Sequence, residues 1–257
     1  MSRTKESTQI PSPVECFIFF NGNTGKFGRP IEDNTNMADL SLPFHFIVLD
    51  DGAFRVGGET RASGVKRKIK SNLAHRDYSK HLIVTYSDNG ALIAEGEWSE
   101  IGTRVKDIGG KYTAVLYVLT KMDEMNRIAA LHLRGRALSE WYKFTKGKNP
   151  TGPVYFSVKQ TKKTEGEDID SWVPVFEEFA LPGQSEEEAN SADVILQNWL
   201  QSYFANPESI PTATQSRSEP AAQPLSNAFH VAVPASTDDP WAGITDPGTG
   251  DIDELPF

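Results

Sequence analysis

Short runs of β-branched and aromatic residues, bounded by Gly, Asn, Asp or Pro, recur through the first two thirds of the chain. Such runs are typical of β-strands, because branched and aromatic side chains pack well on a pleated surface. Helical spacing is scarce in the same region. The pattern therefore predicts a mainly β body, with strands at 17–21, 44–50, 81–87, 91–98, 112–121, 127–133, 154–160 and 172–176.

A tight strand reversal is predicted at Asn89-Gly90, which lies between the runs 81–87 and 91–98. This dipeptide supplies the positive φ angles that a short reversal needs, so we expect the two strands to pair antiparallel. Two further segments are 99–108, which precedes Gly109-Gly110, and 138–146, in which Leu138, Trp141, Tyr142 and Thr145 recur at helical spacing. They are predicted to be short helices.

A longer helix is predicted from Ser185 to Phe204. Ser185 and Glu188 match the S-x-x-E capping box, and acidic side chains in the first turn interact favourably with the positive end of the helix dipole. The apolar residues share one face, which we expect to pack on the β body or on a second copy of the chain. They are Ala192, Ile195, Leu196, Trp199, Leu200 and Tyr203.

After Asn206 the composition changes to Pro, Ser, Thr, Ala and Gln. Few large apolar residues remain there to offset the entropy lost on ordering, which predicts disorder. We therefore expect a flexible N-terminus at 1–13, a β body at 14–183, a C-terminal helix at 184–206 and a disordered acidic tail at 207–257.

Charge is distributed unevenly along the chain, whose formal net charge is -9. Residues 14–163 hold 23 Lys and Arg against 16 Asp and Glu, whereas residues 164–204 hold ten acidic residues and no Lys or Arg. Residues 205–257 add eight acidic residues and one Arg. A basic body followed by an acidic arm indicates a surface for a polyanion and a tail with a separate role. An ordinary solvated charge distribution is the alternative.

Motifs for catalysis or metal binding do not stand out in the sequence. The five histidines show no metal-ligand spacing. The segment GNTGK at 22–26 lacks the glycine spacing and the following hydroxyl residue of a phosphate-binding P-loop, so a turn is expected there. We accordingly predict a protein that binds without catalysing a reaction and that uses neither a cofactor nor a metal ion.

The densest basic segment is 61–76, with six Lys and Arg residues and no acidic residue. Its Gly and Ser content favours a flexible loop that closes over phosphate groups. A solvated run of charge is the alternative. The candidate DNA-binding residues of this segment are Lys66, Arg67, Lys68, Lys70 and Arg76.

A second cluster, 134–148, interleaves cations with aromatic rings. Single-strand binders use this combination, because cations neutralise phosphates while rings stack on unpaired bases at about 1–3 kcal/mol each. Core packing is the alternative for any one ring. The candidates here are Arg134, Arg136, Trp141, Tyr142, Lys143 and Lys146. Strand alternation in 154–160 adds Tyr155 and Lys159, which share a face.

The last residues combine acidic side chains with Leu-Pro-Phe. An aromatic ring that carries a terminal carboxylate suits a hydrophobic pocket rimmed by Lys or Arg, and the acids would steer it towards a basic surface. We therefore predict a tip that docks to partner proteins; a tail that only solubilises is the alternative. The candidate partner-binding residues are Asp251, Asp253, Glu254, Leu255, Pro256 and Phe257.

This tip resembles that of bacterial single-stranded DNA-binding proteins, in which an aspartate run precedes an apolar residue, Pro and Phe. Glu254-Leu255 stands where that tip commonly has Asp and Ile, which keeps the charge and the apolar character. The body resembles bacteriophage single-stranded DNA-binding proteins with an oligonucleotide-binding (OB) fold. The stretches that carry this resemblance are LPFHFIVLD at 42–50, GGKY at 109–112, LRGRAL at 133–138 before Trp141, and SWVPVF at 171–176.

The resemblance implies a mainly β fold with added helices, an elaborated OB-fold barrel, whose groove binds and protects single-stranded DNA during phage replication and recombination. The tip would recruit replication or repair proteins. A strand-annealing or recombination-mediator protein is the alternative function, and a homo-oligomer is compatible with the sequence. No segment approaches the roughly 18 continuous apolar residues of a membrane span. We therefore expect no membrane partner and a location in the cytoplasm of the bacterial host.

Overall fold

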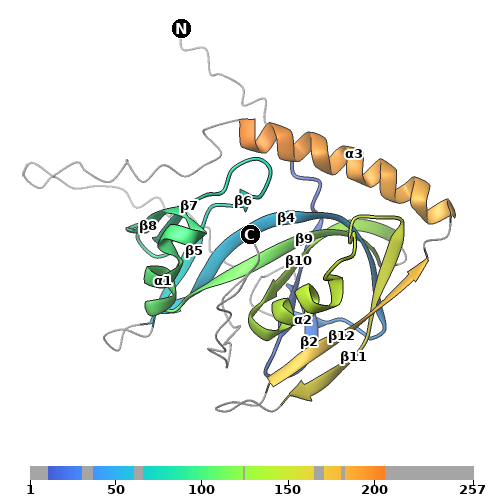
Figure 1. Ribbon diagram of the computed structural model, residues 1–257, viewed down its shortest axis with the longest axis horizontal. Coiled ribbons are helices and arrows are strands. Elements are labelled where there is room, and N and C mark those ends of the chain that lie inside the picture. Colours follow the sequence, from blue (N-terminus) through green and yellow to red (C-terminus); the bar gives the residue numbers. More distant parts are fainter. Residues whose placement is uncertain are drawn as a thin grey trace, which may run out of the picture.

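The computed structural model describes residues 11–30, 37–60, 66–123, 125–164, 171–180 and 183–205. Within them the chain is mainly β, with twelve strands and three helices (Figure 1). The strands are β1 Cys16–Asn21, β2 Lys26–Pro30, β3 Met37–Asp39, β4 Phe44–Thr60, β5 Arg67–Ser71, β6 Ala74–His75, β7 His81–Tyr86, β8 Leu92–Glu97, β9 Gly110–Met122, β10 Met125–Arg134, β11 Val154–Thr164 and β12 Ser171–Ala180. The helices are α1 Trp98–Asp107, α2 Gly135–Thr145 and α3 Gly183–Ala205.

Each of the eight predicted strands coincides with an observed strand, although β4 continues to Thr60 instead of ending at Asp50. The predicted hairpin joins β7 and β8 in an antiparallel pair. Only Gly90 of its turn has a positive φ, of 67°. The two short helices are also confirmed. Helix α2 begins at Gly135, three residues before its predicted start.

The segment 66–76 corrects one prediction, because most of it is not a flexible loop. Arg67–Ser71 forms β5, which pairs antiparallel with β4 and β7. Ile69 explains why: its side chain is only 1% exposed and packs in a core with α1. A buried apolar residue thus holds this basic segment in the sheet. Residues 61–65 lie outside the described part of the chain.

The strands form one open sheet, with the order β3-β2-β1-β10-β9-β4-β5-β7-β8 along its main path. Strand β1 runs parallel to β10, and the other described pairs are antiparallel. Strand β4 lies at the centre. It pairs with β9 along one edge, while β11, β6 and β5 follow one another along the other edge.

Hydrophobic residues are buried on both faces of this sheet. On one face, which we call the inner face, β1, β2, β4 and β9–β12 enclose a core that α2 completes. Trp141 of α2 lies at its centre, with its ring 5.2 Å from Phe156 and 5.1 Å from Phe176. At the β5–β8 end of the sheet a separate core packs against α1.

The opposite, outer face is partly covered by α3, which lies above β4 and β9 in the view of Figure 1. Ala192, Leu196, Trp199 and Leu200 are buried there as predicted, but Ile195 is 56% exposed. The helix begins at Gly183, so Ser185 lies within it and not at the predicted capping position. The described helices include none with the length and apolar character that crossing a membrane requires.

His132 of β10 is buried on the outer face, 3% exposed. Its ring lies 5.9 Å from that of Phe17 and 4.8 Å from that of Phe19. Burial lowers the pKa of His132 well below its usual range, and the positive charges of Arg55 and Arg134 lower it further. The folded protein therefore holds this imidazole in its neutral form at neutral pH.

The free energy of unfolding should depend on pH through His132. The pKa is lower in the folded state than the unfolded value near 6.5, so below pH 6.5 the unfolded chain binds more protons and folding weakens by up to about 1.4 kcal/mol per pH unit. Urea unfolding at pH 7.5 and 5.5 should show a larger loss for the natural chain than for His132→Leu. Equal losses in the two proteins would exclude this role.

Candidate nucleic-acid interface

The register of three neighbouring strands places two arginines on one face of the sheet. Arg55 of β4 is paired with Thr113 of β9, and Thr113 is paired with Arg134 of β10. Directly opposed residues in an antiparallel pair project to the same side. Both guanidinium groups also lower the pKa of His132, which is consistent with their lying close to it.

Lysines continue this line towards β5. Gly57 is paired with Lys111 of β9 on one edge and with Lys70 of β5 on the other. Glu59, two residues further on, is paired with Lys68. Because residues two apart in a strand share a face, these lysines lie on the side of Arg55. We call this set the cationic band: Arg55, Lys68, Lys70, Lys111 and Arg134.

The cationic band lies on the outer face, beside the area that α3 covers. Ala53 and Val115 are paired and both pack in the core beneath α3. Arg55 and Thr113 are the next residues of the same two strands on that face. The outer face therefore passes from an apolar area under the helix to a positively charged area beyond it.

An exposed aromatic side chain accompanies the band. Phe17 of β1 is paired with Ala130 of β10, whose side chain packs beneath α3, so the ring projects to the outer face. It is 40% exposed and meets His132 edge-on. Rings of this kind stack on unpaired bases. Phe17 is thus an exposed ring on the same face as the band.

Three of the predicted DNA-binding residues, Lys68, Lys70 and Arg134, are brought together in this band. Their neighbour Arg67 is not. Arg67 projects to the opposite face, where its guanidinium makes two 2.9 Å bonds to Asp88 and lies 3.7 Å from the ring centre of Tyr86. Lys66 is exposed, with its Nζ 3.7 Å from a carboxylate oxygen of Glu59.

Arg136 follows Arg134 by two residues and lies in the first turn of α2. Its Nη1 donates a 2.9 Å hydrogen bond to Ser171 Oγ. Arg134, Arg136 and Ser171 line a narrow pocket together with Trp172, a half-buried residue at the start of β12. This pocket joins a second aromatic side chain to the cations at the end of β10.

The aromatic residues predicted on α2 belong to the core. Trp141 is 1% exposed, so its ring has no surface to offer a base, and the prediction that it binds DNA is wrong in this structure. Tyr142 is half-buried against the same core. Burial raises the pKa of its hydroxyl, which hydrogen-bonds with Tyr112. Helical spacing had identified the correct face of α2 but not its role.

The remaining predicted cations are separated from the band. Lys143 of α2 and Lys146, the residue after the end of that helix, are exposed, and α2 packs on the inner face; Lys143 Nζ lies 2.9 Å from Glu140. On β11, the ring of Tyr155 stacks on Phe179 at 5.0 Å. Lys159 is exposed, 3.6 Å from Glu177.

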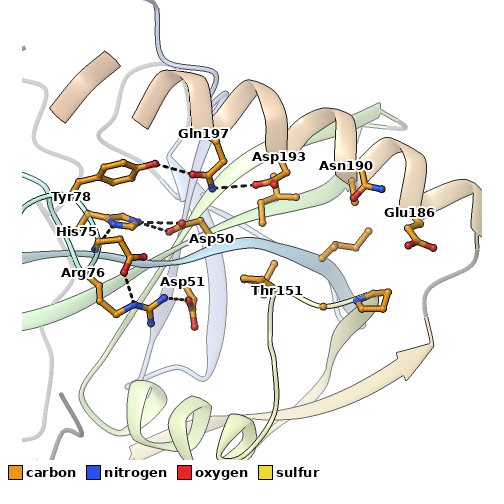
Figure 2. A pocket seen from close by; sticks show the side chains of 17 residues that line it. Asp50, Asp51, His75, Arg76, Tyr78, Thr151, Glu186, Asn190, Asp193 and Gln197 are labelled. Atoms are coloured by element: carbon orange, nitrogen blue, oxygen red, sulfur yellow. Dashed lines mark hydrogen bonds and ion pairs between the residues drawn. The ribbon is translucent and has the colours of Figure 1, made fainter. Parts of the chain in front are cut away.

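Arg76 lies in a different environment, an acidic cleft of about 490 Å³ between β4, α3 and the loops at 75–78 and 151–153 (Figure 2). Its guanidinium contacts Asp51 at 3.1 Å and Asp77 at 3.6 Å. The charge around it is mostly negative, which disfavours a phosphate. Arg76 is therefore a structural cation of the cleft and not part of the cationic band.

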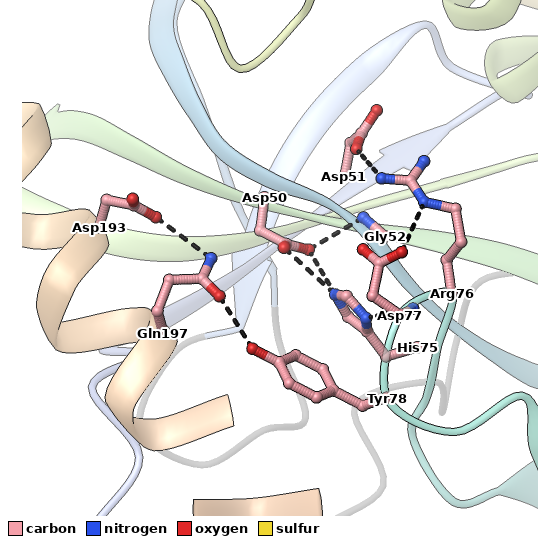
Figure 3. Close-up of polar contacts among 9 residues, drawn as sticks. All are labelled: Asp50, Asp51, Gly52, His75, Arg76, Asp77, Tyr78, Asp193 and Gln197. Carbon is pink, nitrogen blue, oxygen red and sulfur yellow. Dashed lines mark hydrogen bonds and ion pairs between the residues drawn. The ribbon is translucent and has the colours of Figure 1, made fainter. Parts of the chain in front are cut away.

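Asp50 and His75 form the centre of this cleft's polar network (Figure 3). The amide of Asp77 donates to His75 Nδ1 at 3.0 Å, so Nδ1 is an acceptor and Nε2 carries the proton that bonds Asp50 at 3.1 Å. Burial alone would raise the pKa of Asp50, but its bonds with His75 and the Gly52 amide outweigh burial and lower it. Because both ring nitrogens are engaged, the pair joins β4 to the 75–78 loop and has no nitrogen left for proton transfer.

Arg55 and Lys111 are the band residues that the sequence did not suggest, since neither lies in a dense basic segment. The alternation of Arg55 and Gly57 with buried Phe54 and Val56 is the signal that could have found them. Among the described residues, no three His, Cys, Asp or Glu side chains are grouped to hold a metal ion. The predicted partner-docking tip lies outside the described residues.

The comparisons with known proteins add no relative: the sequence matches no family model, and no match was found among curated proteins or among solved structures.

The burial of Trp141 predicts that its replacement affects stability and not ligand affinity. Trp141→Phe should lower the free energy of unfolding by about 1–3 kcal/mol, because the smaller ring leaves part of the core unfilled. Urea unfolding measures this loss. The folded variant should keep its oligonucleotide affinity within about twofold; full stability with weakened affinity would instead identify Trp141 as a stacking residue.

Proposed function

We propose that this protein binds single-stranded DNA without catalysis and with little sequence preference. The observation that carries the proposal is the cationic band, in which strand pairing aligns Arg55, Lys68, Lys70, Lys111 and Arg134 on one face. Such a row neutralises consecutive phosphates and releases their counterions, which supplies sequence-independent affinity. Exposed Phe17 on the same face offers a surface on which an unpaired base stacks.

The order of elements supports an OB-type body. In that fold three strands are followed by a helix and two more strands, and the first strand pairs with both the second and the fourth. The order β4–β9–β10–α2–β11–β12 follows this plan, and β4 pairs with both β9 and β11. OB folds bind oligonucleotides on the face of their second and third strands. Those strands correspond to β9 and β10, which carry Lys111 and Arg134.

The elaboration of this body would be the hairpin β1–β2. In an OB barrel the third and fifth strands meet to close the barrel. Here β1 pairs parallel to β10, and Trp172 of β12 donates its amide to the carbonyl of Gly22 at 2.8 Å, in the turn of that hairpin. The hairpin thus lies between the two strands that would close an OB barrel, and adds the outward-facing Phe17 beside the band.

Fluorescence anisotropy with labelled oligo-dT and its duplex tests the proposal across a salt series. We expect tight binding of the single strand, weak binding of the duplex and a steep salt dependence. In Lys68→Gln/Lys70→Gln the slope should fall by about 0.7 for each phosphate that the variant no longer neutralises, and the affinity by about 10- to 30-fold at 0.1 M salt.

Lys143→Gln/Lys146→Gln is the matched control. It removes the same number of charges from the same chain, but from the C-terminal end of α2 on the inner side of the sheet. We expect its affinity to stay within about threefold of the natural chain. Equal losses in the two double variants would mean that net charge and not the cationic band controls binding, and no single-strand binding at low salt would end the proposal.

The acidic tip would serve the same activity by bringing partner proteins to the bound strand. Its support is the sequence Asp-Ile-Asp-Glu-Leu-Pro-Phe at 251–257, which combines steering charges with a hydrophobic end. We propose replication or repair proteins of the same cell as its partners, and phage replication and recombination as the setting.

A chain ending at Gly250 tests the tip separately from the band. This chain should keep its affinity for oligo-dT within about threefold at 0.2 M salt but lose co-purification with replication proteins. Phe257→Ala, the minimal variant, should reproduce that loss because it removes the ring and retains every acidic side chain. Undiminished co-purification of both variants would show that the partners bind elsewhere.

A further inference from the structure

The acidic cleft opens onto the edge of a strand. Five consecutive β4 residues, Ile47 to Asp51, line it. Val48 is buried in the inner core and Leu49 in the core beneath α3, on opposite faces of the sheet. The register of β4 with β9 shifts between Val48 and Asp50 and again between Asp50 and Ala53, so β4 is bulged along this stretch, and the cleft follows five consecutive residues of it.

The pairing along this edge of β4 has a gap between two partner strands. Strand β11 pairs with β4 at Phe44–Phe46, and β6 pairs with it at Ala53 and Phe54. Between these pairings no strand in the described part of the chain is registered on this edge from Ile47 to Asp51; the Arg76 amide bonds the carbonyl of Gly52 just beyond. An unpaired edge presents N–H and C=O groups that an added strand can use.

The walls of the cleft are acidic. Its lining contains the carboxylates Asp50, Asp51, Asp77, Glu186 and Asp193 against the single guanidinium of Arg76. Arg76 contacts Asp51 and Asp77, and Asp50 is bonded by His75. Glu186 and Asp193 project from α3 into the space opposite β4 (Figure 2). They place negative charge where the side chains of a strand added to β4 would pass.

We propose that this cleft binds an extended segment of a partner protein that carries Lys or Arg at alternate positions, and that the segment pairs with β4 as an added strand. Backbone hydrogen bonds to an open edge supply affinity in this mode of recognition, and the walls select side chains. The gap from Ile47 to Asp51 takes about five residues, at roughly 3.3 Å each. Nucleic acid does not suit the cleft, because its charge has the wrong sign.

Binding of a labelled peptide, Lys-Thr-Lys-Val-Lys-Thr-Lys, to the full chain in 50 mM salt tests the proposal. Two further peptides carry N-methyl groups on the odd or on the even amides. Only alternate amides of a strand point towards a given neighbour, so one methylated peptide should lose at least tenfold in affinity while the other binds nearly as well as the parent. A peptide with Glu in place of Lys should not bind.

Variants of the protein locate the site. Glu186→Gln/Asp193→Asn should weaken binding of the lysine peptide at least fivefold, while Glu187→Gln/Asp107→Asn, which removes two exposed acids outside the cleft, should leave it unchanged. Oligo-dT affinity should not fall in either variant, which separates this site from the cationic band.

Three results would overturn the proposal. Failure of the natural chain to bind the lysine peptide would exclude the site, and equal binding of both methylated peptides would reduce it to a charged patch without strand pairing. An affinity that falls as the protein concentration rises would mean that a second copy of the chain, and not a separate partner, occupies the cleft.

Discussion

Backbone pairing along β4 organises the molecule. One edge of this seventeen-residue strand is taken by β9, whereas the other is divided among β11, β6 and β5. Near its C-terminal end, β4 lies close to the residues just before β9. Gly58 has a φ of 145°, and a Cβ added to it would lie 2.4 Å from the Gly109 carbonyl oxygen. Because buried peptide groups must find hydrogen-bond partners, this division fixes where the α1 end and the β11–β12 hairpin attach, and it leaves the gap at 47–51.

Two surfaces of opposite charge are built on successive parts of this one strand. Residues 47–51 face the acidic cleft, while Arg55 and its paired neighbours carry the cationic band. Helix α3 lies beside both, since its side chains line the cleft and also cover the apolar part of the outer face. Under these two proposals, a polyanion and a basic peptide would bind the same body at different places, because each would be repelled from the other's surface.

The density of charge in the sequence was a poor guide to the site. The segment 61–76 suggested one flexible basic loop, yet Lys70 reaches the band, Arg67 is paired with Asp88 on the other face and Arg76 is held by acids in the cleft. Because side chains alternate along β5, Lys70 and Arg67 lie on opposite faces of the sheet. Arg76 lies in the loop that follows β6. In the second cluster, Trp141 was drawn into the core, because a large ring on the apolar face of a short helix is more stable there than in water.

The sequence alone determined the mainly β character, the positions of eight strands, the β7–β8 hairpin and all three helices, because these depend on local periodicity and turn chemistry. It also indicated a basic body and an acidic tail. Only the tertiary structure decided that Arg55, Lys70, Lys111 and Arg134 lie together, since they come from four different strands. Their proximity follows from the hydrogen-bond register between those strands, and register is set by which side chains the folded core must bury.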